Sequence, residues 1–151
     1  HTRAIIKESF GREIEEIFET FEEEPVASGT VAQVHKATLK REYAIDGKVR
    51  EVAVKVQHPN VLEETYCDAD LLFNLINMLS DKLTIPMNKE DFSLVLQRQT
   101  NFEWEAYNLR KFANNFRRET KEGTLKFPDV SLDLLSPSVL VESWAKGRTI
   151  S

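Results

Sequence analysis

The segment that most limits how this chain can fold is a β-hairpin expected at residues 25–57. Residues 31–39 and 49–57 have the composition of two strands, with β-branched residues recurring through both. Asp46 and Gly47 lie between them and tolerate the positive φ angles that a tight turn requires. The hairpin predicts that the rest of the chain is organised around a small antiparallel sheet.

Lys55 stands out chemically in the second strand of this hairpin. Because side chains alternate across a strand, Val52, Val54 and Val56 point to one face, and Ala53 and Lys55 point to the other. A small residue beside a cation suits a site for nucleotide phosphates. A lysine whose aliphatic stem crosses an apolar surface gives the same pattern. If the strand is buried, the ammonium needs an acidic partner or it loses its proton.

A long helix expected at residues 90–117 is the predicted source of that partner. It carries Gln99, Glu103 and Glu105 near the face that would contact the sheet. A strand lysine that meets a helix carboxylate is the arrangement found in protein kinases, where the lysine holds the α- and β-phosphates of ATP. The sequence therefore predicts a nucleotide site centred on Lys55.

The remaining segments predict an α+β fold with a mostly antiparallel sheet. Beyond the hairpin and the long helix, periodicity predicts helices at residues 2–21 and 61–83, a loop at 84–89, and strands at 127–134 and 139–144. Strands and helices that follow one another in such runs are typical of this class. The 151 residues are enough for one domain with a buried core.

Composition narrows the classes of function. The net charge of −5 gives no basic footprint for nucleic acid. No apolar run approaches the roughly 18 residues of a membrane span. The single cysteine excludes an internal disulfide and a multi-cysteine metal site. No histidine or carboxylate spacing predicts a metal site, so we expect none formed by this chain.

The loop before the first strand is the second candidate binding element. Ala27, Ser28, Gly29 and Thr30 are small enough for their backbone amides to approach a phosphate, although a tight turn would use the same residues. Two histidines lie nearby in the sequence. His35 is expected to be a surface or hydrogen-bonded strand residue, and His58 is assigned no role.

Three stretches together resemble a known family. They are PVASGTVAQVHKA at residues 25–37, VAVKVQHP at residues 52–59, and NFEWEAYN at residues 101–108. They are similar to the N-terminal lobe of the UbiB/AarF-domain-containing family of atypical kinase-like proteins. Ala-Ser-Gly-Thr in place of an alanine run resembles the subgroup typified by AarF-domain-containing kinase two.

The resemblance implies an architecture for the chain. Residues 1–24 would be an N-terminal helical extension, and residues 25–151 a protein-kinase-like N-terminal lobe. That lobe would have a small antiparallel sheet, a long helix facing the sheet and additional family-specific helices. A second lobe, with the catalytic aspartate and the metal-binding residues, would lie outside these 151 residues.

The resemblance also implies roles for individual residues. Lys55 would contact the nucleotide and Ala53 would lie against adenine. Ala27, Ser28, Gly29 and Thr30 would cover the phosphates, and Glu142 would begin the hinge at the adenine edge. In much of the family, the glutamate that pairs with the lysine falls where this chain has Gln99. Glu105 is then the substitute partner, displaced by about 9 Å along a continuous helix.

The implied ligand is ATP with Mg²⁺, the metal being held by the second lobe. By resemblance, the full protein would be mitochondrial and would support coenzyme Q and lipid metabolism, with lipid or lipid-biosynthesis proteins as partners. Whether it is an enzyme stays open, because a pseudokinase scaffold would carry the same lobe. An unrelated α+β interaction domain is the remaining alternative, and the oligomeric state is not predicted.

Overall fold

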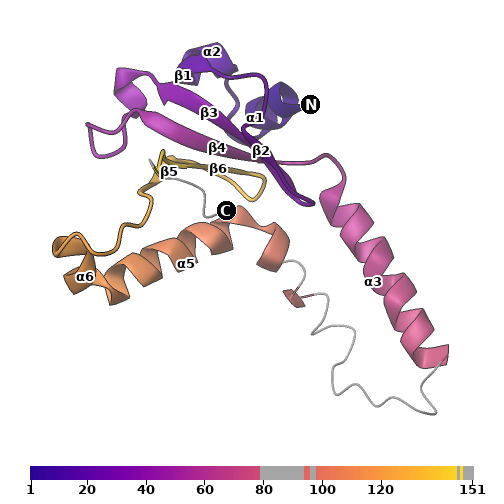
Figure 1. The fold of residues 1–151 in the computed structure, drawn as a ribbon. Coiled ribbons are helices and arrows are strands. Elements are labelled where there is room, and N and C mark those ends of the chain that lie inside the picture. The colour runs from indigo at the N-terminus through magenta and orange to yellow at the C-terminus, as the bar shows by residue number, and fades with distance from the viewer. Residues whose placement is uncertain (79–93, 96–97, 146, 148–151) are drawn as a thin grey trace.

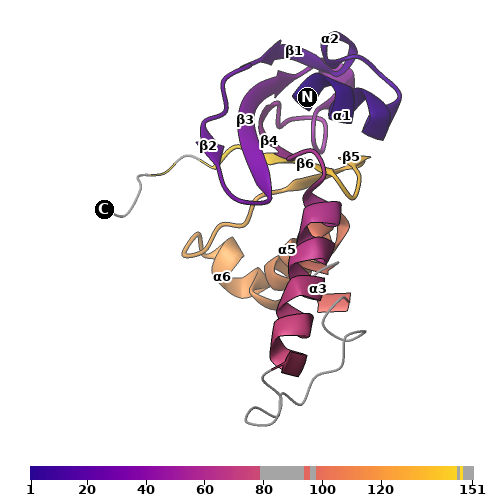
Figure 2. The ribbon, with the colours of Figure 1, turned by 90° about the vertical axis from the view of Figure 1, so that its right-hand side faces the viewer.

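The fold is an antiparallel sheet with helices on both of its faces. The computed structural model describes residues 1–78, 94–95, 98–145 and 147. Helices α1 (Thr2–Phe10) and α2 (Ile14–Ile17) cover one face, and α5 (Phe102–Asn115) lies against the other (Figure 1). Helix α3 (Val61–Met78) runs away from the sheet in both views (Figures 1 and 2). The predicted α+β class is confirmed.

The six-stranded sheet has the order β1-β3-β4-β6-β5, with β2 pairing to β3, and every pairing is antiparallel. Its strands are β1 (Phe18–Phe21), β2 (Ala27–Ser28), β3 (Ala32–Leu39), β4 (Glu51–Gln57), β5 (Val130–Leu135) and β6 (Val139–Ser143). The central strand β4 is therefore flanked by β3 and β6. Strand β6, which is distant in sequence, pairs with β4 on the side opposite β3.

The predicted hairpin is confirmed as β3 and β4. Val34 lies opposite Lys55 in the register, and Asp46 and Gly47 both have positive φ, 50° and 68°. A short 3₁₀ helix, η1 (Arg41–Tyr43), precedes the turn. These features give the connection the left-handed residues that the Asp-Gly pair predicted.

The larger core lies on the α1 and α2 side of the sheet. Val52, Val54 and Val56 are fully buried there, together with Ile6 and Ile17 from the two helices. Each such side chain contributes about 1.5–3 kcal/mol on burial. On the opposite face a smaller cluster joins Phe102 and Ala106 of α5 to Leu140 of β6. The alternation predicted for β4 therefore separates an apolar face from the face that carries Lys55.

The prediction of one helix over residues 2–21 is wrong. Helix α1 ends at Gly11, which has φ 66°, and α2 starts after a capping box formed by Glu13 and Glu16. Residues 18–21 then pair with β3, because hydrogen bonds to its open edge and burial of Phe18 outweigh the local helical spacing. The predicted domain boundary at residue 24 stays a prediction. Strand β1, before that boundary, pairs with β3, after it.

The prediction of one helix over residues 90–117 is also wrong. Asn101 is extended, with φ −97° and ψ 114°, and its side chain accepts a hydrogen bond from the Glu103 amide at 2.8 Å. Asparagine is a favoured N-cap, so a new helix begins at Phe102. A short helix α6 (Arg117–Lys121) follows α5. The loop expected at residues 84–89 lies outside the described residues.

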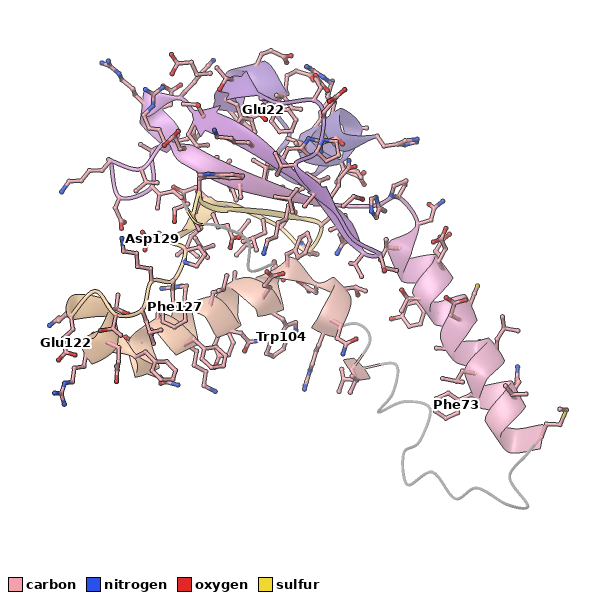
Figure 3. All side chains as sticks on the ribbon, viewed as in Figure 1. Glu22, Phe73, Trp104, Glu122, Phe127 and Asp129 are labelled. Atoms are coloured by element: carbon pink, nitrogen blue, oxygen red, sulfur yellow. The ribbon has the colours of Figure 1, made fainter. Side chains whose placement is uncertain are left out.

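Helix and strand ends elsewhere agree with the sequence analysis to within a few residues. Helix α3 was expected from Val61 and begins there; the described part ends at Met78. The last two strands were expected at 127–134 and 139–144, and are observed as β5 and β6. Figure 3 shows Phe127 and Asp129 in the segment that returns from α6 to β5. Ser143 anchors this segment by donating its amide to the Asp129 carbonyl at 2.8 Å.

Candidate nucleotide site

Lys55 lies on the face of β4 that α5 covers, and its side chain is 23% exposed. Its Nζ donates a hydrogen bond to Oε1 of Glu105 on α5. The same Nζ lies 3.2 Å from Oε1 of Glu142 on β6. Lys55 therefore joins the central strand, its neighbour and the helix through one ammonium group.

The break at Asn101 explains why Glu105 reaches Lys55. Phe102 and Ala106 are buried against Leu140 and fix the rotation of α5. Glu105 adjoins Ala106 and lies three residues after Phe102, so it shares the sheet-facing side of the helix. The 9 Å displacement expected from Gln99 assumed a continuous helix and does not apply. Gln99 itself is exposed.

Glu142 reaches Lys55 because of the sheet register. It lies opposite Ala53 in the pairing of β4 with β6, so both side chains lie on the Lys55 face. Its side chain is 10% exposed, and Oε2 is buried with no hydrogen-bond partner among the described residues. This second carboxylate was predicted only as a hinge residue, because the register of the sheet was unknown.

Burial and pairing shift the pKa values of this cluster. Burial raises the pKa of the Glu142 carboxyl above its usual value, and the nearby ammonium only partly opposes this. Burial acts to lower the pKa of Lys55, but Glu105 and Glu142 together outweigh it, so that the pKa of Lys55 is raised. Lys55 is therefore a cation at neutral pH, with two carboxyl groups beside it.

Residues 27–30, predicted as a loop, form the short strand β2 and the turn that leads from it into β3. Ala27 and Ser28 pair with Val34 and Gln33, and the Gly29 amide donates to the Ala32 carbonyl at 2.9 Å. All four loop residues are exposed. These residues are thus open to solvent beside the end of β4 that carries Lys55 and Gln57.

His58 holds this loop, although the sequence analysis assigned it no role. Its Nε2 donates to the Gly29 carbonyl at 2.9 Å and lies 3.4 Å from Ser28 Oγ, while its backbone amide donates to the Val31 carbonyl at 3.0 Å. Pairing of Ala32 with Gln57 brings His58 beside this loop. The role of His58 could have been predicted from the β3–β4 register, which places the residue after Gln57 next to the residues before Ala32.

Gln57 anchors the start of α5 from the same strand. Its side chain is buried, and Nε2 donates to the carbonyls of Thr100 and Pro137, the latter at 3.1 Å. Thr100 directly precedes the Asn101 cap, so β4 fixes where the helix begins. His35, in contrast, is structural: it is buried, and its Nδ1 donates to the Glu22 carbonyl at 2.8 Å.

The strand order, the strand lysine and the helix carboxylate bonded to it together define the N-terminal lobe of a kinase-like protein. The family model described as the ABC1 atypical kinase-like domain matches residues 1–151. The chain therefore belongs to the ABC1 family, the group that also contains UbiB and the AarF-domain-containing kinases. The predicted kinase-like lobe is confirmed.

Individual relatives support this assignment. The probable serine/threonine-protein kinase abkC of Dictyostelium discoideum is 37% identical over 99% of this chain and 21% of its own length. A mitochondrial ABC1 family protein of Schizosaccharomyces pombe is 30% identical over the whole chain and 25% of its own length. The structure of Rv3197 with erythromycin, from Mycobacterium tuberculosis, superposes with a TM-score of 0.70 at 27% identity and covers 97% of this chain and 35% of that one. The chain thus spans about a fifth to a third of these relatives.

Proposed function

We propose that this chain is the ATP-binding lobe of an atypical kinase or ATPase of the UbiB type. The observation that carries the proposal is the hydrogen-bonded ion pair between Lys55 and Glu105. Membership of a kinase-like family implies a nucleotide ligand. A lysine held by a helix carboxylate is the group that kinases use to orient the α- and β-phosphates.

The residues present fit this ligand. Lys55 is charged, and the exposed residues Ser28, Gly29 and Thr30 lie next to its strand. Ala53 is small and 8% exposed, which suits contact with a flat base. Glu142 lies opposite Ala53 in the sheet, so the residue proposed to begin the hinge adjoins the residue proposed to contact the base. In this scheme Lys55 orients the phosphates, Glu105 positions Lys55, and residues 27–30 cover the phosphates.

Magnesium would accompany the nucleotide. With both carboxyls ionised, Lys55, Glu105 and Glu142 carry a net charge of −1, which disfavours free polyphosphate and favours its metal complex. Among the described residues, no three His, Cys, Asp or Glu side chains gather as a metal site. By family resemblance, we propose that the metal ligands belong to the second lobe. When bound, Mg²⁺ would neutralise charge on the transferring phosphoryl group.

A pseudokinase scaffold is the alternative that Gln99 favoured. Because Gln99 is exposed and Glu105 occupies the place beside Lys55, that reason for a defective site is removed. We retain an active nucleotide site as the proposed function. Turnover would additionally require the catalytic aspartate of a second lobe.

The cellular role follows from family likeness. We propose a mitochondrial protein that supports coenzyme Q and lipid metabolism, with lipid or lipid-biosynthesis proteins as partners; the mitochondrial relative in Schizosaccharomyces pombe supports the compartment. No helix in the part of the chain that the structure describes is long and apolar enough to cross a bilayer. The subgroup of AarF-domain-containing kinase two is proposed from residues 27–30 alone, since neither relative described above bears that name.

Isothermal calorimetry of Mg-ATP binding to the full-length protein tests the proposal. Lys55→Met should weaken binding at least tenfold, about 1.4 kcal/mol. Lys48→Met removes an exposed lysine at the β3–β4 connection and should leave the affinity unchanged. Equal affinity in the wild type and Lys55→Met would reject a nucleotide site at Lys55.

A further inference from the structure

A groove runs between α5 and the edge strand β5, on the side of the helix away from Lys55's ion pair. Its volume is about 830 Å³, within the range of ligand-binding clefts. It is lined by Glu103, Ala106, Tyr107, Arg110, Lys111, Ala113, Asn114, Arg117, Leu132 and Leu135. None of these residues is assigned to the nucleotide site.

The groove is cationic in a chain with a net charge of −5. Arg110, Lys111 and Arg117 line it, against the single carboxylate of Glu103. Among the described residues these three cations form no ion pair: Arg117 donates to the Asn114 side chain at 2.6 Å, and Lys111 lies 5.9 Å from the centre of the Tyr107 ring. Their charge is available to an anionic ligand.

The groove also offers apolar contact. Leu132 of β5 is 55% exposed, and Ala106, Ala113 and Leu135 contribute further apolar surface. β5 ends the sheet, so no other described strand covers this side. A ligand that presents both carboxylates and an apolar side chain would match this surface, whereas a free phosphate would leave Leu132 uncovered.

The groove is elongated. Its α5 residues recur on one face of the helix from Glu103 to Asn114, a rise of about 17 Å. An extended peptide of about five residues spans that length. Arg117, just beyond the end of α5, is the last helix residue of the groove in sequence. A concave groove along one helix face suits an extended chain better than the flat surface of a membrane.

We propose that this α5–β5 groove docks an acidic peptide segment of a partner protein. Carboxylates of the segment would pair with Arg110, Lys111 and Arg117, and an apolar side chain would pack on Leu132. Bidentate pairing makes arginine well suited to carboxylate recognition. The site lies outside the nucleotide cluster and is defined by its own residues.

Docking would also act on the nucleotide site. Glu105 lies between groove residues Glu103 and Ala106 on the same helix. A peptide that bridges α5 and β5 stabilises the position of α5 in which Glu105 holds Lys55. By linkage, the peptide and Mg-ATP then raise each other's affinity by the same factor. This second step rests on the proposed function, whereas the docking itself does not.

The test starts from a phage-displayed library of random peptides, selected on the full-length protein and depleted on its Arg110→Glu variant. The enriched peptide is synthesised with a fluorophore, and its affinity is measured by anisotropy. We expect acidic residues around an apolar one, and at least tenfold weaker binding to Arg110→Glu and to Leu132→Asp. Lys48→Glu, which makes the same change of charge at an exposed turn, should bind as the wild type does.

Several outcomes would overturn docking: a basic or neutral consensus, no peptide whose binding depends on Arg110, or equal loss in Lys48→Glu. Arg110-dependent sedimentation with phosphatidylglycerol vesicles, without peptide binding, would point to a membrane instead.

Mg-ATP calorimetry separates the docking proposal from the proposed nucleotide site, because Arg110→Glu should keep its nucleotide affinity in the absence of peptide. Peptide binding to a wild type that binds no Mg-ATP would sink the proposed function and leave docking intact. A peptide that leaves Mg-ATP affinity unchanged would refute the linkage alone.

Discussion

Replacement of Lys55 by methionine should destabilise the fold through Glu142 rather than through Glu105. Methionine keeps the aliphatic stem but removes the ammonium that lies 3.2 Å from Glu142 Oε1. Glu142 then keeps a buried carboxylate that has lost its only cation among the described residues. The Glu105 side chain is 40% exposed and can turn to water.

The expected loss of stability in Lys55→Met follows from the burial of Glu142. Removal of one partner of a fully buried ion pair costs about 3–5 kcal/mol. Because the Lys55 side chain is 23% exposed, we expect a loss of about 2–4 kcal/mol. For a chain of this size that lowers the melting temperature by about 5–15 °C. Glu105→Gln alone should cost less, about 1 kcal/mol, because the Glu105 side chain is 40% exposed and Lys55 keeps Glu142 as a partner.

Rescue and pH dependence identify the cause. In Lys55→Met, adding Glu142→Gln should recover more than half of the lost stability. The pKa of Glu142 is raised in the folded protein, so its protonated form favours folding below the unfolded value of 4.5. This contribution is lost as the pH rises through the folded pKa. Without Lys55 that pKa rises further, so the cost of Lys55→Met should be small near pH 4.5 and should grow towards neutral pH.

Urea denaturation of the wild type, Lys55→Met, Glu142→Gln and the double variant at several pH values measures these differences. Lys48→Met serves as the matched control for loss of an exposed lysine. A cost that is independent of pH and unaffected by Glu142→Gln would refute the assignment to a stranded carboxylate. Lost packing of the lysine stem would then be the cause.

Three further predictions concern the neighbours of this cluster. Gln99→Glu should change neither the melting temperature nor the calorimetric Mg-ATP affinity, because Gln99 is exposed and Glu105 already pairs with Lys55; a clear gain in affinity would contradict this. Gln57→Ala should cost about 1–3 kcal/mol in urea denaturation, because two hydrogen bonds from its buried side chain to the carbonyls of Thr100 and Pro137 are lost, while Gln99→Ala serves as the control. His58→Phe should weaken Mg-ATP binding severalfold with a stability loss below about 1 kcal/mol, because the loop loses its bond at Gly29; unchanged affinity would remove the positioning role.

The hairpin was predictable because its signals are local. Alternation fixes which side chains of β4 share a face, and Asp46-Gly47 supplies the positive φ angles of the turn. The N-terminal strand was not predictable in this way. Phe18 and Phe21 satisfy helical spacing, and only the open edge of β3, which is distant in sequence, makes them a strand.

Glu105 was predicted as the substitute partner of Lys55, but the way it reaches the lysine and the second carboxylate, Glu142, were not. A local signal was present at Asn101, a favoured N-cap, but helical periodicity continues across it and hid the break. For Glu142, no local signal exists. Its place beside Lys55 depends on the pairing of Ala53 with Glu142, and a shift of one residue would turn the carboxylate to the opposite face.

β4 and the residue that follows it therefore position most of the candidate site. Lys55 bonds the first turn of α5, and Gln57, two residues on, bonds the carbonyl just before that helix. His58 then holds the loop at Gly29. These contacts fix only the start of α5, whereas the groove residues from Arg110 onward lie along its remaining length. A ligand in the groove would restrain the part of the helix that β4 does not hold. Because Glu105 lies on the same helix, docking there should also stabilise its bond to Lys55.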